Sequence, residues 1–98
     1  MVEKIIWNKR ASNKLTKIID FLNEVASEKV VRQFVENVDE KISLIKKFPE
    51  IGRPSSKNKT IRFFRIDKHK LLYYRKKGNT IIIINIFDTR QNPNKNPY

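Results

Sequence analysis

The chain of 98 residues contains no cysteine, one histidine and two glycines. The absence of cysteine excludes a disulfide scaffold and a thiolate zinc site, and it fits the reducing cytosol. No stretch reaches the roughly 18 consecutive apolar residues that a membrane-spanning helix needs. The N-terminus lacks the apolar core and small-residue cleavage site of a signal peptide, so we expect a cytoplasmic protein.

Acidic residues are also scarce, because ten Asp and Glu oppose 22 Lys and Arg. The resulting formal net charge of +12 attracts polyanions or an acidic protein partner, although many small basic proteins bind nothing anionic. A chain of this length is expected to form one domain, residues 1–98, with one modest core.

The nearly unbroken β-branched run at residues 80–88 organises the predicted fold. Turn-forming residues bound it on both sides, which is typical of a strand. Because it is apolar on both faces, we place it inside a sheet, with Asn85 as its one polar interruption. Strict alternation predicts Ile82, Ile84 and Ile86 on one face, and Ile81, Ile83 and Phe87 on the other.

Two amphipathic helices are predicted before this strand, over about residues 9–25 and 28–47. Apolar residues recur there every three or four positions. Asn8 and Ser27 are suitable N-caps. The pair Phe48-Pro49 ends the second helix, because the residue before proline avoids the helical region. The short connection predicts an antiparallel helix hairpin.

Three more strands are predicted, at residues 3–7, 60–66 and 69–76, and residues 49–56 are expected to form a loop. The fold class is therefore α+β, in the order β-α-α-β-β-β. The N-terminal strand and the helix hairpin pack on a small antiparallel sheet in two layers, and the other sheet face is left for water or partners. Residues 91–98 lack periodicity and are expected to be a flexible tail.

The pair Gly78-Asn79 predicts a two-residue hairpin turn. With that turn, the numbers of paired residues sum to 157, whereas a three-residue loop would change the register. The predicted pairs are Arg75–Ile82, Tyr73–Ile84, Leu71–Ile86 and His69–Asp88. The last pair would orient an imidazole as a general base, although such cross-strand pairs are more often surface contacts.

The sequence contains no phosphate-binding glycine loop, metal-ligand cluster or Ser-His-Asp pattern, so we expect no metal and no cofactor. Basic and aromatic residues instead occur together on the predicted sheet. Cations hold phosphates and aromatic faces stack exposed bases. Alternatively, the aromatic residues pack against the helices while the cations surround the sheet. The set is Arg62, Phe64, Arg65, His69, Lys70, Tyr73, Tyr74, Arg75 and Arg90.

Several short motifs, in their order and spacing, resemble the RelE/ParE superfamily of bacterial toxins, the toxic halves of type II toxin–antitoxin pairs. The resemblance extends from Ile5 to about Pro93. It implies the helix-hairpin fold expected above, and a cognate antitoxin that is acidic, partly disordered and wraps the toxin. We expect oligomers only with the antitoxin. The motifs are Phe48-Pro49-Glu50-Ile51-Gly52-Arg53-Pro54, Ile61-Arg62-Phe63-Phe64, His69-Lys70-Leu71-Leu72-Tyr73-Tyr74-Arg75, Ile81 to Phe87, and Arg90.

The superfamily divides by target: RelE-like members cut messenger RNA on the ribosome, and ParE-like members poison DNA gyrase. The resemblance implies that a metal-independent endoribonuclease would use Arg62, Arg65, Lys70 and Arg90, with His69 and Tyr98 as further candidates. Lys70 stands where an arginine is typical, and Asp88-Thr89 where some nucleases carry a terminal histidine and tyrosine. The loop at 49–54 looks more like ParE members, which favours gyrase.

If the chain cuts nothing, its cationic residues are predicted to contact the target or a nucleic acid. A third alternative is a non-toxic basic nucleic-acid-binding domain, which rests on charge and sheet aromatics alone. No membrane partner is expected. The predicted contact residues are Arg62, Arg65, Lys70, Tyr74, Arg75 and Arg90.

Overall fold

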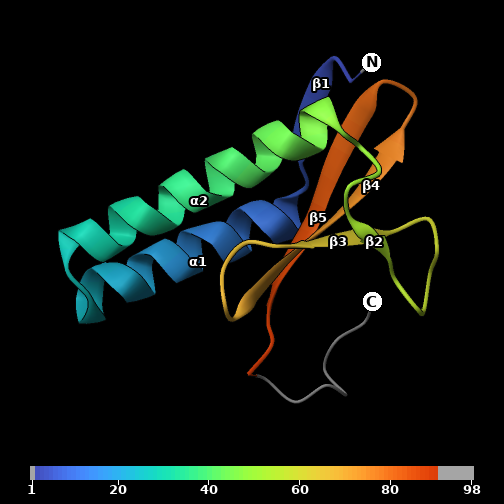
Figure 1. The fold of residues 1–98 in the computed structure, drawn as a ribbon. Coiled ribbons are helices and arrows are strands. Elements are labelled where there is room, and N and C mark those ends of the chain that lie inside the picture. Colours follow the sequence, from blue (N-terminus) through green and yellow to red (C-terminus); the bar gives the residue numbers. More distant parts are fainter. Residues whose placement is uncertain (1, 91–98) are drawn as a thin grey trace.

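The computed structural model describes residues 2–90, and it has two helices on one face of a five-stranded sheet (Figure 1). The predicted α+β class is confirmed. The predicted tail at 91–98, with Tyr98, lies outside the described residues. The elements are β1 (Lys4–Trp7), α1 (Lys9–Val25), α2 (Glu28–Lys47), β2 (Arg53–Pro54), β3 (Arg62–Arg65), β4 (Lys70–Lys77) and β5 (Thr80–Asp88).

Both helices begin at the predicted caps. The Asn8 Oδ1 atom accepts a hydrogen bond from the Ala11 amide at 2.8 Å, and the Ser27 Oγ atom accepts one from the Val30 amide at 3.3 Å. Each cap satisfies an amide that has no partner within its own helix. The second helix ends at Lys47, directly before Phe48, as the following proline predicts.

The strand order is β1-β5-β4-β3-β2, so β5 lies inside the sheet as predicted. The sheet is mixed rather than wholly antiparallel, because β1 runs parallel to β5, with Ile5 opposite Ile81. The chain crosses between these strands through both helices and the remaining strands, which permits the parallel pairing. The predicted loop at 49–56 contains a short edge strand, in which Arg53 pairs with Phe63.

The predicted register holds for only half of the β4–β5 hairpin. The turn at Gly78, whose φ is 60°, pairs Arg75 with Ile82 as expected. A β-bulge then inserts Ile84 as an extra residue. The predicted pairs Tyr73–Ile84, Leu71–Ile86 and His69–Asp88 are therefore wrong. The pairs beyond the bulge are Tyr73–Asn85, Leu72–Ile86, Leu71–Phe87 and Lys70–Asp88.

The bulge also changes which side chains share a face. Ile86 joins Ile81 and Ile83 under the helices, whereas Ile84 and Phe87 belong to a cluster on the opposite face. The predicted grouping is therefore wrong beyond Ile84, because one extra residue reverses the alternation.

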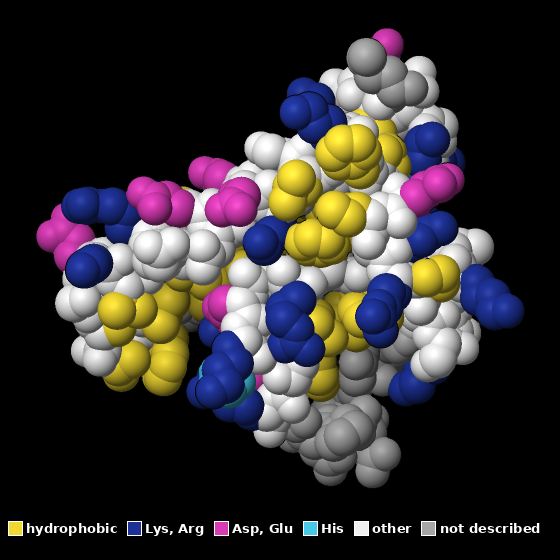
Figure 2. Space-filling model, viewed as in Figure 1, with side chains coloured by type: hydrophobic (Ala, Val, Ile, Leu, Met, Phe, Trp, Pro, Cys, Tyr) yellow, Lys and Arg dark blue, Asp and Glu magenta, His cyan; other side chains and the backbone are white. Residues whose placement is uncertain are grey.

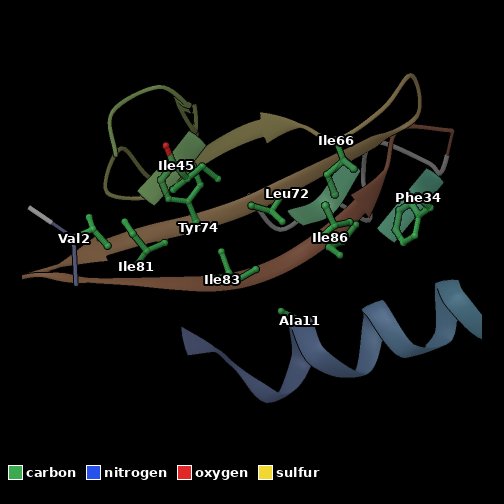
Figure 3. Packing of buried hydrophobic residues seen from close by; sticks show 11 residues of the cluster. Val2, Ala11, Phe34, Ile45, Ile66, Leu72, Tyr74, Ile81, Ile83 and Ile86 are labelled. Carbon is green, nitrogen blue, oxygen red and sulfur yellow. The ribbon is translucent and has the colours of Figure 1, made fainter. Parts of the chain in front are cut away.

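The main core fills the space between the helices and the sheet (Figure 3). Leu72 and Tyr74 of β4 are fully buried there, and Ala11 packs where α1 crosses the sheet. The opposite face is not simply left to water, since Ile61, Tyr73, Ile84 and Phe87 form a second buried cluster. Within residues 2–90, neither helix is long and apolar enough to cross a membrane.

Candidate functional site

The segment at residues 48–52, which we term the latched loop, is fixed to the sheet by Tyr74. The Tyr74 hydroxyl donates a hydrogen bond to the Pro49 carbonyl oxygen at 2.7 Å and accepts one from the Gly52 amide at 2.9 Å. Burial raises the pKa of this hydroxyl, so it stays protonated and remains a donor. Arg62 adds a hydrogen bond from Nη1 to the Gly52 carbonyl oxygen at 2.7 Å.

Two of the predicted contact residues therefore serve the fold. Tyr74 is 0% exposed, so its side chain cannot meet a partner in this structure, contrary to the prediction. The guanidinium of Arg62 is engaged with loop carbonyl oxygens, including that of Glu50 at 3.4 Å. Tyr74 and Arg62 hold the loop in place. From the sequence alone, this structural role cannot be told apart from a role in partner binding.

The cationic candidates lie on both faces of the sheet. Arg62 pairs with Tyr74 on the helix side, where the Lys70 ammonium also lies 5.5 Å from the Phe34 ring centroid. Arg65 pairs with Leu71, whose side chain packs against the cluster on the opposite face. Neighbours in a ladder share a face, so these cations do not converge on one point.

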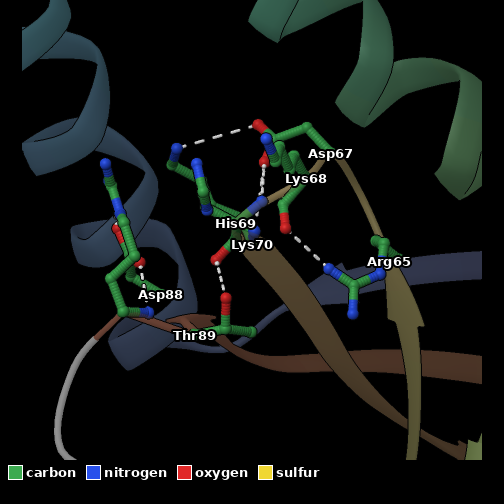
Figure 4. A network of polar contacts seen from close by, with 8 residues as sticks. Arg65, Asp67, Lys68, His69, Lys70, Asp88 and Thr89 are labelled. Carbon is green, nitrogen blue, oxygen red and sulfur yellow. Dashed lines mark hydrogen bonds and ion pairs between the residues drawn. The ribbon is translucent and has the colours of Figure 1, made fainter.

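Two ion pairs occupy the end of the sheet (Figure 4). The Arg90 guanidinium donates to Asp88 twice, from Nε to Oδ1 at 3.0 Å and from Nη2 to Oδ2 at 2.6 Å. These bonds hold the pKa of Asp88 at about 2. The Lys70 Nζ atom lies 3.7 Å from Asp67 Oδ2, so both cations are matched by an acid.

His69 takes part in this region through its backbone rather than its imidazole. Its amide donates to Asp67 Oδ1 at 2.9 Å, and its carbonyl oxygen accepts from the Thr89 amide at 2.7 Å. Asp88, its predicted partner, is bound by Arg90. Among residues 2–90 the imidazole makes no hydrogen bond, so the predicted oriented general base is absent from this part of the chain.

A hollow of about 210 Å³ lies between α1 and the end of β5, and we term it the α1–β5 hollow. Its floor is apolar and four cations surround it. Phe21 was missed by the sequence analysis because it lies off the core stripe of α1, and a large exposed apolar residue in that position is itself a signal. The lining residues are Lys14, Lys17, Ile18, Phe21, Leu22, Lys70, Asp88 and Arg90.

Two further hollows adjoin the latched loop. The edge hollow, of about 360 Å³, lies beside β3 and includes Arg53, Phe63 and Arg65. The loop hollow, of about 270 Å³, includes Lys47, Phe48 and Lys76. Ile51 lines both, so it forms the ridge between them.

Charge is divided unequally along the chain. Residues 53–90 contain eleven Lys and Arg against two Asp, a net +9, whereas residues 1–52 contain ten against eight, a net +2. Figure 2 shows Asp and Glu mainly over the helices. The sheet half therefore carries most of the positive field. Within residues 2–90, no three His, Asp or Glu side chains lie close enough together to hold a metal ion.

Several solved structures, among them bacterial toxins, share this fold. A chromosomal ParDE toxin–antitoxin protein from P. aeruginosa superposes with a TM-score of 0.75 at 21% identity, covering 90% of this chain and 96% of that one. The YoeB/ParE toxin from Agrobacterium tumefaciens superposes with a TM-score of 0.64 at 17% identity, covering 88% of this chain and 98% of that one. YoeB from Staphylococcus aureus superposes with a TM-score of 0.60 at 18% identity, covering 89% of this chain and 97% of that one. The chain thus has the RelE/ParE-like toxin fold.

The sequence identifies the family more narrowly. Residues 5–93 match the family model described as the ParE toxin of the type II toxin–antitoxin system parDE. Among curated protein sequences, none matches. The chain belongs to the ParE toxin family, which implies a cognate ParD antitoxin as its partner.

Proposed function

We propose that this toxin inhibits growth by binding DNA gyrase, and that it does not cut messenger RNA. The separation of the cationic candidates supports this. Cleavage through a 2′-hydroxyl needs a base, an acid and cations held around one phosphate. Here Arg62 and Lys70 lie on the helix side, Arg65 lies on the other, and Arg90 is bound to Asp88.

The α1–β5 hollow is our proposed contact for the acidic, partly disordered antitoxin. Its apolar floor and its surrounding lysines suit an amphipathic acidic segment that folds as it binds. We propose Arg65 and Arg75 as target contacts. Both are exposed, and among residues 2–90 the Arg75 side chain makes no hydrogen bond or ion pair.

The decisive experiment is inducible expression in a bacterium without the antitoxin, with pulse labelling of DNA and protein synthesis. We expect DNA synthesis to fall first, and the purified chain to inhibit gyrase supercoiling. An early collapse of translation with cleaved messenger RNA would instead establish the RelE-like alternative. Harmless expression together with nucleic-acid binding in vitro would establish the non-toxic alternative.

A matched pair of variants tests the proposed contacts. Arg65→Ala with Arg75→Ala removes two exposed cations and should weaken gyrase inhibition. The control Arg32→Ala removes an exposed cation of α2 that lies 3.3 Å from Glu28, and should change nothing. Equal gyrase inhibition by both variants would show that Arg65 and Arg75 do not contact the target.

A further inference from the structure

The latched loop exposes two large apolar side chains, which are three positions apart in the sequence. Phe48 is 56% exposed and Ile51 is 40% exposed. Figure 2 shows hydrophobic side chains bordered by Lys and Arg, with an acidic side chain among them, where the end of α2 leads into β2 and β3. Exposed apolar groups inside a polar border are typical of a protein contact surface.

This loop is rigid because its backbone is bonded from end to end. The Phe48 amide donates to the Leu44 carbonyl oxygen at 2.7 Å, and the Ile51 amide donates to the Phe48 carbonyl oxygen at 2.9 Å. Tyr74 then holds Pro49 and Gly52. Phe48 and Ile51 are therefore held in position before any partner arrives, which lowers the entropy lost on binding.

The charges around these residues restrict what can bind. Lys47, Lys76 and one acid, Glu50, line the hollow on one side of Ile51. Arg53 and Arg65 line the hollow on the other side, so four cations outnumber one carboxylate. The repulsion between like charges disfavours a second copy of this chain. A ridge of one phenylalanine and one isoleucine gains nothing from a phosphate backbone, so the chemistry favours an acidic protein surface with an apolar recess.

We propose that Phe48 and Ile51, with Lys47, Lys76 and Arg53 around them, form the surface that docks on an acidic face of the toxin's folded target protein. This inference rests on the proposed function. A disordered antitoxin gains affinity by folding into grooves such as the α1–β5 hollow. A rigid ridge instead suits a folded partner that binds with little change of shape, and it concentrates binding energy in a few central residues.

The test uses the full chain, purified gyrase and the purified cognate antitoxin. Phe48→Ser with Ile51→Ser removes the ridge but leaves the latching hydrogen bonds intact. We expect gyrase affinity to fall about tenfold or more, growth inhibition to disappear, and antitoxin affinity to change less than about twofold. The matched control is Val25→Ser with Val30→Ser, which changes side chains 63% and 46% exposed at the hairpin tip and should keep full growth inhibition.

A second variant tests the same surface without changing the two apolar side chains, so that a loss of binding cannot be ascribed to a loss of fold. Lys47→Glu with Lys76→Glu reverses two exposed charges and should weaken target binding most at low salt. The proposed surface would be overturned if the Phe48/Ile51 variant lost antitoxin binding. It would also be overturned if neither this variant nor the Lys47/Lys76 variant changed growth inhibition. If the unchanged chain stops growth without inhibiting gyrase, only the gyrase proposal fails, and growth inhibition by the same variants decides the surface. An unchanged chain that does not stop growth overturns both.

Discussion

The hydroxyl oxygen of Tyr74 accepts a hydrogen bond from the amide of Gly52, which lies 22 residues earlier in the chain, at 2.9 Å. This contact joins the centre of β4 to the loop that follows α2. It explains why a fully buried tyrosine stands beside Leu72 on the helix-facing side of β4. The loop conformation that exposes Phe48 and Ile51 depends on it.

Tyr74→Phe should lower the free energy of unfolding by about 1–3 kcal/mol, because the Gly52 amide and the Pro49 carbonyl both lose a buried partner. Denaturant unfolding measures this. Arg75→Ala, an exposed change on the same strand, should stay within about 0.5 kcal/mol of the unchanged protein. Equal stability of all three proteins would show that the latch contributes nothing.

Gly52→Ala should destabilise the fold by about 1–3 kcal/mol through overpacking. A Cβ atom at Gly52 would lie 2.7 Å from the Tyr74 hydroxyl oxygen and 2.8 Å from the Phe63 carbonyl oxygen. The control is Gly78→Asn, since Gly78 has open space and a φ of +60° that asparagine tolerates. The two melting temperatures should therefore differ clearly, and a similar small loss for both would contradict the packing argument.

Stability should depend on Asp88 at acidic pH. Arg90 lowers the pKa of Asp88 from its ordinary value of 3.8 to about 2 in the folded protein. A lowered pKa stabilises the fold above the ordinary value, and this contribution disappears as the pH falls toward 2. Unfolding free energies measured from pH 5 to 2 should therefore fall more steeply for the unchanged protein than for Asp88→Asn. Parallel curves would mean that the ion pair does not form in solution.

Asn8→Ala should lower the free energy of unfolding by about 1 kcal/mol, because the Ala11 amide loses its cap. Ser27→Ala should cost less, since its bond to the Val30 amide is longer, at 3.3 Å. Thermal unfolding of both variants beside Asn13→Ala, an exposed change inside α1, checks the order. A larger loss for Ser27→Ala would contradict it.

The candidate site was only partly predictable. The sequence indicated which cations and aromatic residues matter, but not their sides of the sheet. Tyr73 and Tyr74 are neighbours in the chain, yet one belongs to the cluster on the far face and the other to the main core. The bulge at Ile84 moved Asp88 from His69 to Lys70, which removed the predicted general base.

The sequence by itself determined the two helices, their caps, the two-residue turn and the interior position of β5, because these follow from local periodicity and from the residues at element ends. Only the tertiary structure decided the parallel pairing of β1 with β5, the bulge and the Tyr74 latch. Each of these depends on contacts between distant segments, and one inserted residue changes every pairing beyond it. Hence the family could be recognised from the sequence, whereas the exposed Phe48 and Ile51 ridge became visible only in the folded chain.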